Sequence, residues 1–256
     1  MNIVLLQWNI GGGLIRFVDA DPSKDESYCH DGIEHICNKI KEFAPDIITF
    51  QESHADANHM QAEYIVKKLG YEYFVNYAYD LSHLQSGQKL CQSVISRFPI
   101  LEPSFQFFYN PRVEAVRPNG DRWVSHDKGV TRCMITIAEN TVIELKTCHS
   151  LPLRKFGLKD TDKSFLQVSE SMQENLVLIS PFALLAGDFN YDNKSLEAYL
   201  PRIFTDGVKE VPQIEPTTPG GRRYDHVVYK GIKLVSSHVD NDVLTDHFPV
   251  VANLVL

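Results

Sequence analysis

The chain has 256 residues, of which 43% are hydrophobic and 23% are charged, and this balance is ordinary for a globular protein with a sizeable core. Its formal net charge is −8 and its pI is about 5.7, whereas proteins that bind duplex nucleic acid mainly by neutralising phosphates are usually basic. Avid non-specific DNA binding is therefore not expected, although a local basic loop or a bound divalent cation can still provide a positive field for a nucleic-acid substrate.

Targeting and redox signals indicate a cytoplasmic protein. The N-terminus lacks a basic segment followed by an extended apolar one, so no signal peptide is expected, and no apolar stretch approaches the ~20 residues of a membrane span. The five cysteines are odd in number and contain no Cys-x-x-Cys spacing, which predicts reduced thiols with neither a zinc site nor a disulfide framework. No linker or internal repeat divides the chain, and we expect a single domain over residues 1–256.

The first half of the chain is predicted to alternate strands with helices. Strands are expected over residues 2–8, 46–51, 71–77 and 91–97, and helices over 29–43 and 56–69. Two of these strands run into a polar side chain, since Asn9 follows the first strand and Glu52 follows the second. The glycines at 11–13 let backbone pass close to another group, but no helix begins promptly after them, so they are a weak signal for a phosphate cradle.

A segment rich in proline, arginine and aromatic residues, 103–128, is predicted to be a long loop. A long loop in a compact domain is usually either functional or disordered. Arginine and aromatic side chains suit phosphates and stacked bases, but a packed surface loop is an equal alternative. The substrate-binding candidates in this segment and in the strand after it are Tyr109, Arg112, Arg117 and Arg132.

The second half of the chain is predicted to be richer in strands. Residues 130–138 and 141–148 are expected to form a hairpin that turns at Glu139-Asn140 and ends at His149. A single histidine after a strand is more often a surface or core residue than a catalyst. A helix is expected over 163–179, a buried strand up to Gly187, a pair of strands over 224–229 and 232–235, and a last strand over 250–254.

The stretch 182–190, Phe-Ala-Leu-Leu-Ala-Gly-Asp-Phe-Asn, carries the clearest chemical pattern. An apolar run with the length of a buried strand stops at Gly187, and Asp188 and Asn190 follow on either side of Phe189. In extended backbone, residues i and i+2 point to the same side, so a carboxylate and a carboxamide are delivered together. The Asp can orient or deprotonate a water, and the Asn can donate to a developing oxyanion. The alternative is a turn, because Asp and Asn after Gly bond readily to their own backbone.

Polar side chains repeatedly follow, or lie within, short apolar strands. They are Asn9, Glu52, His149, Asp188, Asn190, Asp225, Asp246 and His247. Such groups are costly unless they converge on one site. The oxygen donors Asn9, Glu52 and Asp246 suit Mg²⁺ or Mn²⁺ better than zinc, and Asp225 is a candidate to orient an imidazole. With two histidines for phosphate contact or proton transfer, the set predicts metal-assisted attack of water on a phosphate ester.

Six short motifs resemble, in order, those of the endonuclease/exonuclease/phosphatase superfamily, which includes DNase I. They are Trp8-Asn9-Ile10, Phe50-Gln51-Glu52, Cys148-His149, Gly187-Asp188-Phe189-Asn190, Arg223-Tyr224-Asp225-His226 and Thr245-Asp246-His247-Phe248-Pro249. The resemblance extends from residue 2 to residue 254. One such motif is a weak signal, but six in the family's order are a strong one.

This resemblance implies the fold and the cofactor. The expected fold is a four-layer α/β/β/α sandwich, in which two mixed sheets pack face to face with helices outside. The resemblance also implies a divalent-metal phosphohydrolase in which Glu52 is the principal metal ligand, with Asn9 and Asp246 close by. Mg²⁺ is the expected ion, and Mn²⁺ is the alternative.

The resemblance further implies a role for each remaining candidate. Asp188 is expected to orient or deprotonate the attacking water, and Asn190 to hold the phosphate. His247, paired with Asp225, is expected to stabilise the phosphorane-like state. His149 is expected to contact the phosphate or to assist the leaving oxygen.

Several departures from the family's patterns bear on the substrate. Gly11 stands where abasic-site endonucleases usually carry Asp or Asn, and Phe248 stands where they carry Trp. The acidic residue that tyrosyl-DNA phosphodiesterases tend to carry after the first motif is missing, and the inositol phosphatase signatures are not evident. Cys148 replaces the Thr that commonly precedes the His. No subfamily is therefore assigned.

Taken together, these features predict a cytoplasmic, monomeric, Mg²⁺-dependent phosphodiesterase that acts on nucleic acid. A phospholipid, as in sphingomyelinases, or a small phosphoester is the alternative substrate, which the acidic pI and the aromatic-rich segment 103–128 favour. A non-catalytic binding module on the same fold is the third interpretation. It is disfavoured because every polar catalytic position is filled, and a decayed enzyme is expected to have lost some of them.

Overall fold

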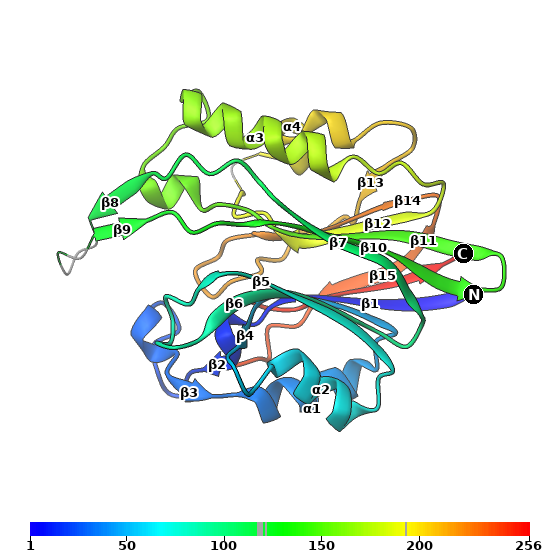
Figure 1. The fold of residues 1–256 in the computed structure, drawn as a ribbon, viewed down its shortest axis with the longest axis horizontal. Coiled ribbons are helices and arrows are strands. Elements are labelled where there is room, and N and C mark those ends of the chain that lie inside the picture. The colour runs from blue at the N-terminus through cyan, green and yellow to red at the C-terminus, as the bar shows by residue number, and fades with distance from the viewer. Residues whose placement is uncertain (117–119, 121, 193) are drawn as a thin grey trace.

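Two β-sheets packed face to face, with helices on both outer surfaces, make up the fold (Figure 1). The computed structural model describes residues 1–116, 120, 122–192 and 194–256. Each of the two sheets has six strands, and each mixes parallel with antiparallel neighbours. The predicted four-layer α/β/β/α sandwich is therefore confirmed.

The first sheet is built around a parallel pair of strands, β1 (Asn2–Asn9) and β4 (Ile47–Ala55). Helix α1 (Ile33–Phe43) connects these two strands, and α2 (Gln61–Leu69) follows β4; both helices pack on the outer face of the sheet. The sheet has the order β15-β16-β1-β4-β6-β5, in which the further strands are β5 (Tyr73–Leu81), β6 (Lys89–Ser96), β15 (Lys233–Val239) and β16 (Val250–Val255).

The second sheet repeats this plan around the parallel pair β11 (Thr141–His149) and β12 (Ala183–Asp188). Helix α3 (Lys163–Leu176) lies between these two strands in the chain and, with the short α4 (Leu196–Tyr199), covers the outer face. The sheet has the order β13-β14-β12-β11-β10-β7, in which the further strands are β7 (Ile100–Phe107), β10 (Gly129–Ala138), β13 (Lys209–Glu210) and β14 (Asp225–Lys230).

Small elements connect the strands and helices of the sandwich. They are two hairpins, formed by β2 (Leu14–Ile15) with β3 (His30–Asp31) and by β8 (Glu114–Val116) with β9 (Arg122–Val124), and the 3₁₀ turns η1 (Gly11–Gly13), η2 (Asp25–Ser27), η3 (Leu153–Phe156) and η4 (Pro201–Ile203). Figure 1 shows the β8–β9 hairpin projecting from the end opposite the two chain termini.

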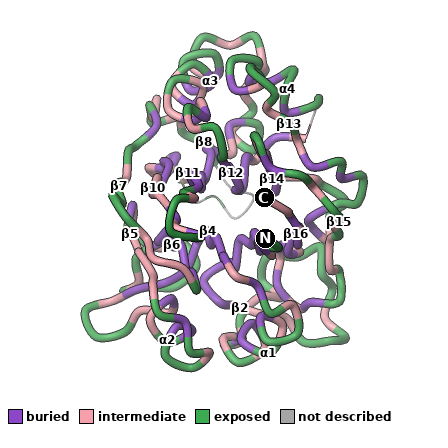
Figure 2. Tube along the Cα trace, turned by 90° about the vertical axis from the view of Figure 1, so that its right-hand side faces the viewer, coloured by how far each residue is buried: buried purple, intermediate pink, exposed green. Residues whose placement is uncertain are grey.

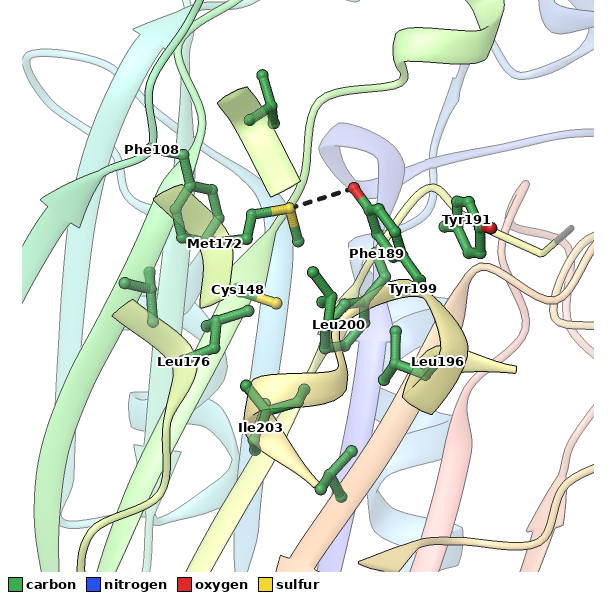
Figure 3. Packing of buried hydrophobic residues seen from close by; sticks show 14 of the residues in the cluster. Phe108, Cys148, Met172, Leu176, Phe189, Tyr191, Leu196, Tyr199, Leu200 and Ile203 are labelled. Carbon is green, nitrogen blue, oxygen red and sulfur yellow. Dashed lines mark hydrogen bonds between the residues drawn. The ribbon is translucent and has the colours of Figure 1, made fainter. Parts of the chain in front are cut away.

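Three apolar clusters fill the layers between these elements. One lies between the two sheets and includes Leu5 and Leu184, and the others lie beneath the helices on each outer face. Figure 2 shows that buried residues run along the strands and along the inward sides of the helices. In the cluster beneath α3 and α4, shown in Figure 3, the Tyr199 hydroxyl donates to the Met172 sulfur at 3.6 Å. Packing on both faces holds the strands in place and so fixes the positions of residues at their ends.

Between the sheets, side chains change from apolar to polar toward the end of the sandwich that lies far from the termini. The inward residues of β1, in chain order, are Ile3, Leu5, Gln7 and Asn9. Those of β11 are Ile143, Leu145, Thr147 and His149. Buried polar groups need partners, and here the two sheets provide them for each other: Gln51 of β4 donates to the Thr147 hydroxyl at 2.8 Å. This polar end is where the candidate site lies.

The structure corrects four sequence-based expectations about secondary structure. The segment 103–128 is not one long loop, because it contains the end of β7 and the hairpin β8–β9. The strands expected over 224–229 and 232–235 exist, but they do not pair: β14 belongs to the second sheet and β15 to the first. Strand β4 does not end before Glu52 but continues through it. The helix expected from residue 29 begins at Ile33.

Among the described residues, no helix is long and apolar enough to span a membrane.

Candidate active site

Three candidate residues of the second sheet lie in one row. The strand register aligns His149 of β11 with Asp188 of β12, and Asp188 with Asp225 of β14. Residues in register share a face of the sheet, so all three side chains point toward the first sheet. Gly187 allows the close pairing of β11 with β12, because a Cβ on it would lie 2.2 Å from the Cys148 carbonyl oxygen. A larger residue at position 187 would therefore clash with Cys148, which explains the glycine before Asp188.

Asp188 is the centre of the cluster. Its Oδ2 accepts a hydrogen bond from the Asn9 amide at 2.9 Å, and lies 3.4 Å from His149 Nε2 and 3.9 Å from His247 Nε2. Burial alone would raise the pKa of Asp188, but the hydrogen bond from His149 and the charge of His247 outweigh burial and hold this pKa well below its usual range. The carboxylate is therefore ionised at neutral pH and can accept a proton or orient a water.

Asn190 reaches the site by a turn rather than by extended backbone. Its φ is 48°, in the left-handed region that Asn tolerates better than most residues. Its backbone N–H donates to Asp188 Oδ1 at 2.8 Å, and its side-chain amide donates to the Ser150 carbonyl at 3.1 Å. The turn interpretation of the Asp-Phe-Asn stretch is thus correct about the backbone. The same turn places Asn190 beside Asp188, so the two interpretations are compatible.

His247 is paired with a carboxylate. Its Nδ1 lies 2.7 Å from Asp225 Oδ2, and Gln7 donates to the other oxygen of Asp225 at 3.3 Å. Burial would lower the pKa of His247, but the charge and hydrogen bond of Asp225 outweigh burial and raise this pKa to about 10. The Trp8 indole donates to the His247 carbonyl at 3.0 Å and so fixes the backbone of this motif. His247 is therefore charged, and its Nε2 points toward Asp188.

Glu52 is turned toward the site by an irregularity in β4. The register between β4 and β6 shifts between Phe50 and Ser53, and Glu52 within this bulge has a φ of 55°. Bulges re-aim a side chain and recur next to active sites. Glu52 Oε1 lies 3.2 Å from Lys128 Nζ and 3.6 Å from His149 Nε2. Burial would raise the pKa of Glu52, but the nearby charge of Lys128 outweighs burial and holds this pKa well below its usual range.

His149 faces a cation, unlike His247. Lys128 Nζ lies 2.8 Å from His149 Nε2 and 3.0 Å from Nδ1, and the Tyr79 hydroxyl lies 3.1 Å from Nδ1. An ammonium group can only donate, so His149 has to present an unprotonated ring nitrogen to it. Burial and the charge of Lys128 lower the pKa of His149, in agreement with that geometry. His149 is therefore neutral.

Asp246 has the features of a carboxylate that lacks a cation. Its Oδ1 is buried, and no residue of the described chain donates a hydrogen bond to it. Burial raises the pKa of Asp246 to about 6. Gly11 packs directly on this oxygen, because a Cβ on Gly11, whose φ is 48°, would lie 2.5 Å from Oδ1, and the Gly11 N–H donates to Asn9 Oδ1 at 3.1 Å. The first glycine of the triplet thus brings Asn9 and Asp246 together.

These donors fit a magnesium ion better than a zinc ion. Asn9, Glu52 and Asp246 present only oxygens, and the buried oxygen of Asp246 without a hydrogen bond is a ready cation ligand. Among the described residues, no three His, Cys, Asp or Glu side chains are gathered closely enough to hold a metal by themselves. Mg²⁺ is suited to such an open arrangement, because it keeps several waters and takes only one or two carboxylates from the protein.

The substrate-binding candidates are not brought into this cluster. Arg132 shares a sheet face with Lys146, opposite to that of His149, and its Nε donates to Glu144 at 3.1 Å. Arg112 is exposed and pairs with Asp127. Tyr109 is also exposed, with its N–H donating to Ser171 Oγ on α3. Arg117 lies outside the described residues.

Three residues of the site were not among the sequence candidates. Lys128 directly precedes β10, Tyr79 lies within β5, and Gln7 lies on β1 two residues before Asn9. The candidates selected from the sequence follow strands or lie within them, whereas Lys128 lies before a strand. In an antiparallel sheet the start of one strand and the end of its neighbour share an edge. Polar residues before strands were therefore the signal that could have identified Lys128.

Comparison with known proteins identifies relatives by family and by fold. The model of the Endonuclease/Exonuclease/phosphatase family matches residues 6–247. No curated protein sequence matches the chain. Among solved structures, an endonuclease/exonuclease/phosphatase from Beutenbergia cavernae DSM 12333 has a TM-score of 0.75 at 17% identity, over 100% of this chain and 72% of that one.

Two further similar structures contain DNA. D. rerio TDP2 complexed with single-strand DNA product has a TM-score of 0.62 at 11% identity, over 100% of this chain and 99% of that one. The 3′ phosphatase NExo from Neisseria bound to a product DNA hairpin has a TM-score of 0.61 at 14% identity, over 98% of both chains. At these identities the structural comparisons show a shared fold.

Proposed function

The chain belongs to the endonuclease/exonuclease/phosphatase family, a family of phosphoester hydrolases, and on this premise we propose that it is a Mg²⁺-dependent phosphodiesterase that cleaves nucleic acid. The observation that carries the proposal is the cluster around Asp188. The buried, ionised carboxylate of Asp188 lies within 4 Å of Asn9, His149 and His247. These three residues come from the end of β1, the end of β11 and the segment before β16. Such a cluster of buried polar groups is expected at a catalytic site and not in a structural core.

Each residue has a task that its surroundings support. Asp188 orients or deprotonates the attacking water, and its low pKa keeps it ionised, so that it can accept a hydrogen bond from that water. The charged His247, oriented by Asp225, stabilises the negative charge that develops on the phosphoryl oxygens. The neutral His149 and the Asn190 amide are suited to contact the phosphate by hydrogen bonds.

The metal site is assigned to Asn9, Glu52 and Asp246. These residues would hold Mg²⁺, which would supply a positive charge to polarise a phosphoryl oxygen. The Gly11 N–H orients the Asn9 oxygen, and the bulge in β4 orients Glu52, so these ligands are fixed before the ion binds. Mn²⁺ is the alternative ion, since it takes the same oxygen donors.

Nucleic acid is the preferred substrate because two proteins of the same fold hold DNA products, TDP2 of D. rerio and the Neisseria phosphatase. A phospholipid or a small phosphoester is the alternative, which the net charge of −8 favours. We also propose that the protein is a monomer with a single domain and that it acts in the cytoplasm. The exposed Tyr109 and Arg112 are proposed as outer contacts for a substrate.

The test is hydrolysis with Mg²⁺, and with a chelator as control, of plasmid DNA, single-stranded oligonucleotide, RNA, sphingomyelin and a phosphomonoester. We expect metal-dependent cleavage of a nucleic acid, with products that distinguish internal from terminal attack. Activity on lipid or monoester alone would overturn the substrate and keep the reaction. No hydrolysis of any of them by a folded, Mg²⁺-bound protein would contradict the proposal.

A further inference from the structure

Lys128 is the one buried cation of the site that the proposed function leaves without a task. Its side chain is about 4% exposed, and burying an ammonium group is costly unless the group is paired. It has one carboxylate partner, Glu52, at 3.2 Å, and His149 Nδ1, the ring nitrogen left to accept when Nε2 faces Asp188, at 3.0 Å. The face of Tyr79 lies beneath it, with the ring centroid 5.4 Å from Nζ. All three partners are themselves residues of the candidate site.

The backbone of Lys128 is held by both sheets without help from its ammonium group. The Phe108 N–H donates to the Lys128 carbonyl at 2.9 Å, which fixes it to the end of β7. The Gln92 side chain of β6 donates to the next carbonyl, that of Gly129, also at 2.9 Å. Because strand pairing and an inter-sheet hydrogen bond already fix this point of the chain, a structural anchor is not needed there. The charge therefore calls for another explanation.

The ammonium group has the capacity to bind one more acceptor. It carries three N–H donors, and it meets two residues that can accept, Glu52 and His149. The acceptor expected at this point is a phosphoryl oxygen, since Glu52 is the proposed metal ligand and His149 the proposed phosphate contact. A hydrogen bond from an ammonium group to phosphate is charge-assisted, and such bonds are roughly twice as strong as those between neutral groups.

We propose that Lys128 binds the phosphate of the substrate, and that by sharing Glu52 it also limits how tightly this site holds a divalent ion. The inference rests on the proposed function and extends it with a residue that neither the family match nor the sequence motifs include. Its two parts predict opposite effects of the Lys128 charge on the affinity for a divalent ion and on the affinity for phosphate. A positive charge 3.2 Å from Glu52 Oε1 competes with a metal ion for that carboxylate, whereas the same charge attracts a phosphate.

The test is calorimetric titration of the purified protein with MgCl₂, and then with inorganic phosphate at saturating Mg²⁺. Lys128→Met removes the charge and keeps an unbranched side chain of similar length. We expect the Kd for Mg²⁺ to fall at least about threefold, because a competing charge is gone. We expect the Kd for phosphate to rise at least about tenfold, the usual effect of losing a charged hydrogen bond. Lys128→Arg, which keeps the charge, is expected to retain phosphate binding within about fivefold of the wild type.

The matched control is Lys233→Met, which removes the positive charge of an exposed lysine at the start of β15, beside Val255 near the chain terminus. Both affinities are expected to stay within about twofold of the wild type, because the site is not touched. Circular dichroism checks folding, and Lys128→Gln replaces the Met variant if that one does not fold. Weaker binding of both Mg²⁺ and phosphate, or no change in either, would overturn the inference. A wild-type protein that binds no Mg²⁺ would instead overturn the proposed function, so the two failures are distinguishable.

Discussion

The two sheets share one plan but bring different chemistry to the site. Each contains a parallel pair whose strands are connected through a helix, β1 and β4 through α1, and β11 and β12 through α3. In each, an antiparallel strand lies beside the first member of the pair, β16 beside β1 and β10 beside β11. The sandwich is therefore nearly symmetric in its topology (Figure 1).

Corresponding positions of this plan carry different residues. The first strand of each pair ends in Asn9 or in His149, and the second carries Glu52 or Asp188. The difference is greatest in front of the antiparallel strand, where Asp246-His247 precedes β16 and Lys128 precedes β10. The first sheet thus contributes the proposed metal ligands Asn9, Glu52 and Asp246. The second contributes Asp188, the proposed proton acceptor, and the buried ammonium group of Lys128.

The comparison teaches that local charge, not residue type, sets the task of each side chain. His247 faces Asp225, and its pKa is raised to about 10, whereas His149 faces Lys128, and its pKa is lowered. One of the two histidines in this small site is consequently charged, and the other is neutral. The predictions below test whether the two halves are as separate as this arrangement suggests.

The largest effect is expected from Asp188→Asn, which breaks the second-sheet half. The change keeps the shape of the side chain and removes the charge that would accept a proton. We expect turnover to fall by at least about 10³-fold, in the range of a lost general base, while the affinity for Mg²⁺ changes little. Steady-state kinetics and calorimetric Mg²⁺ titration would measure the two quantities. Asp242→Asn, whose side chain is 96% exposed, is the control with no expected effect on either.

Glu52→Gln breaks the first-sheet half and should give the reverse pattern. We expect the Mg²⁺ concentration for half-maximal activity to rise at least about tenfold, because the amide is a neutral and weaker ligand. Saturating Mg²⁺ is expected to restore most of the activity, which it cannot do for Asp188→Asn. An unchanged Mg²⁺ requirement would show that Glu52 is not a metal ligand, and that the two halves do not divide the work as described.

The family resemblance predicted the four layers, and the positions of polar residues at strand ends predicted a set that the structure brings together, such as Asn9, His149 and Asp188. The sequence could not predict the orientation of Glu52, since the bulge depends on how β4 pairs with β6, a strand about 40 residues further along. It could not separate β14 from β15 either, because the two strands are joined by a short turn and yet belong to different sheets. Nearness in sequence was a poor guide to pairing at that point.

The substrate-binding candidates show a second limit. Arg132 was selected for its type, but alternation along β10 decides which face it takes, and the partner Glu144 lies on the outer face. Lys128, four residues earlier, is oriented toward the site and was not selected. Residue type without register therefore selected an arginine on the face opposite His149 and left out the lysine that contacts Glu52.

The smallest and most specific effect is expected from Asp225→Asn, which should make the two histidines alike. In the metal-free protein, with chelator present, the imidazole resonances of His247 are expected to titrate near pH 10, and in the variant nearer to about 6.5, the ordinary histidine value. The sign follows from linkage: a pKa raised by folding adds stability that is complete below the unfolded value and is lost as pH rises through about 10. The variant should lose that added stability at neutral pH and show a turnover lower by about tenfold at pH 7, with its alkaline limit shifted down.

His149 should remain uncharged in both proteins, because Lys128 and not Asp225 sets its state. A wild-type His247 that titrates near 6.5 would mean that the pairing with Asp225 does not hold its charge, and the contrast between the two halves would then be lost.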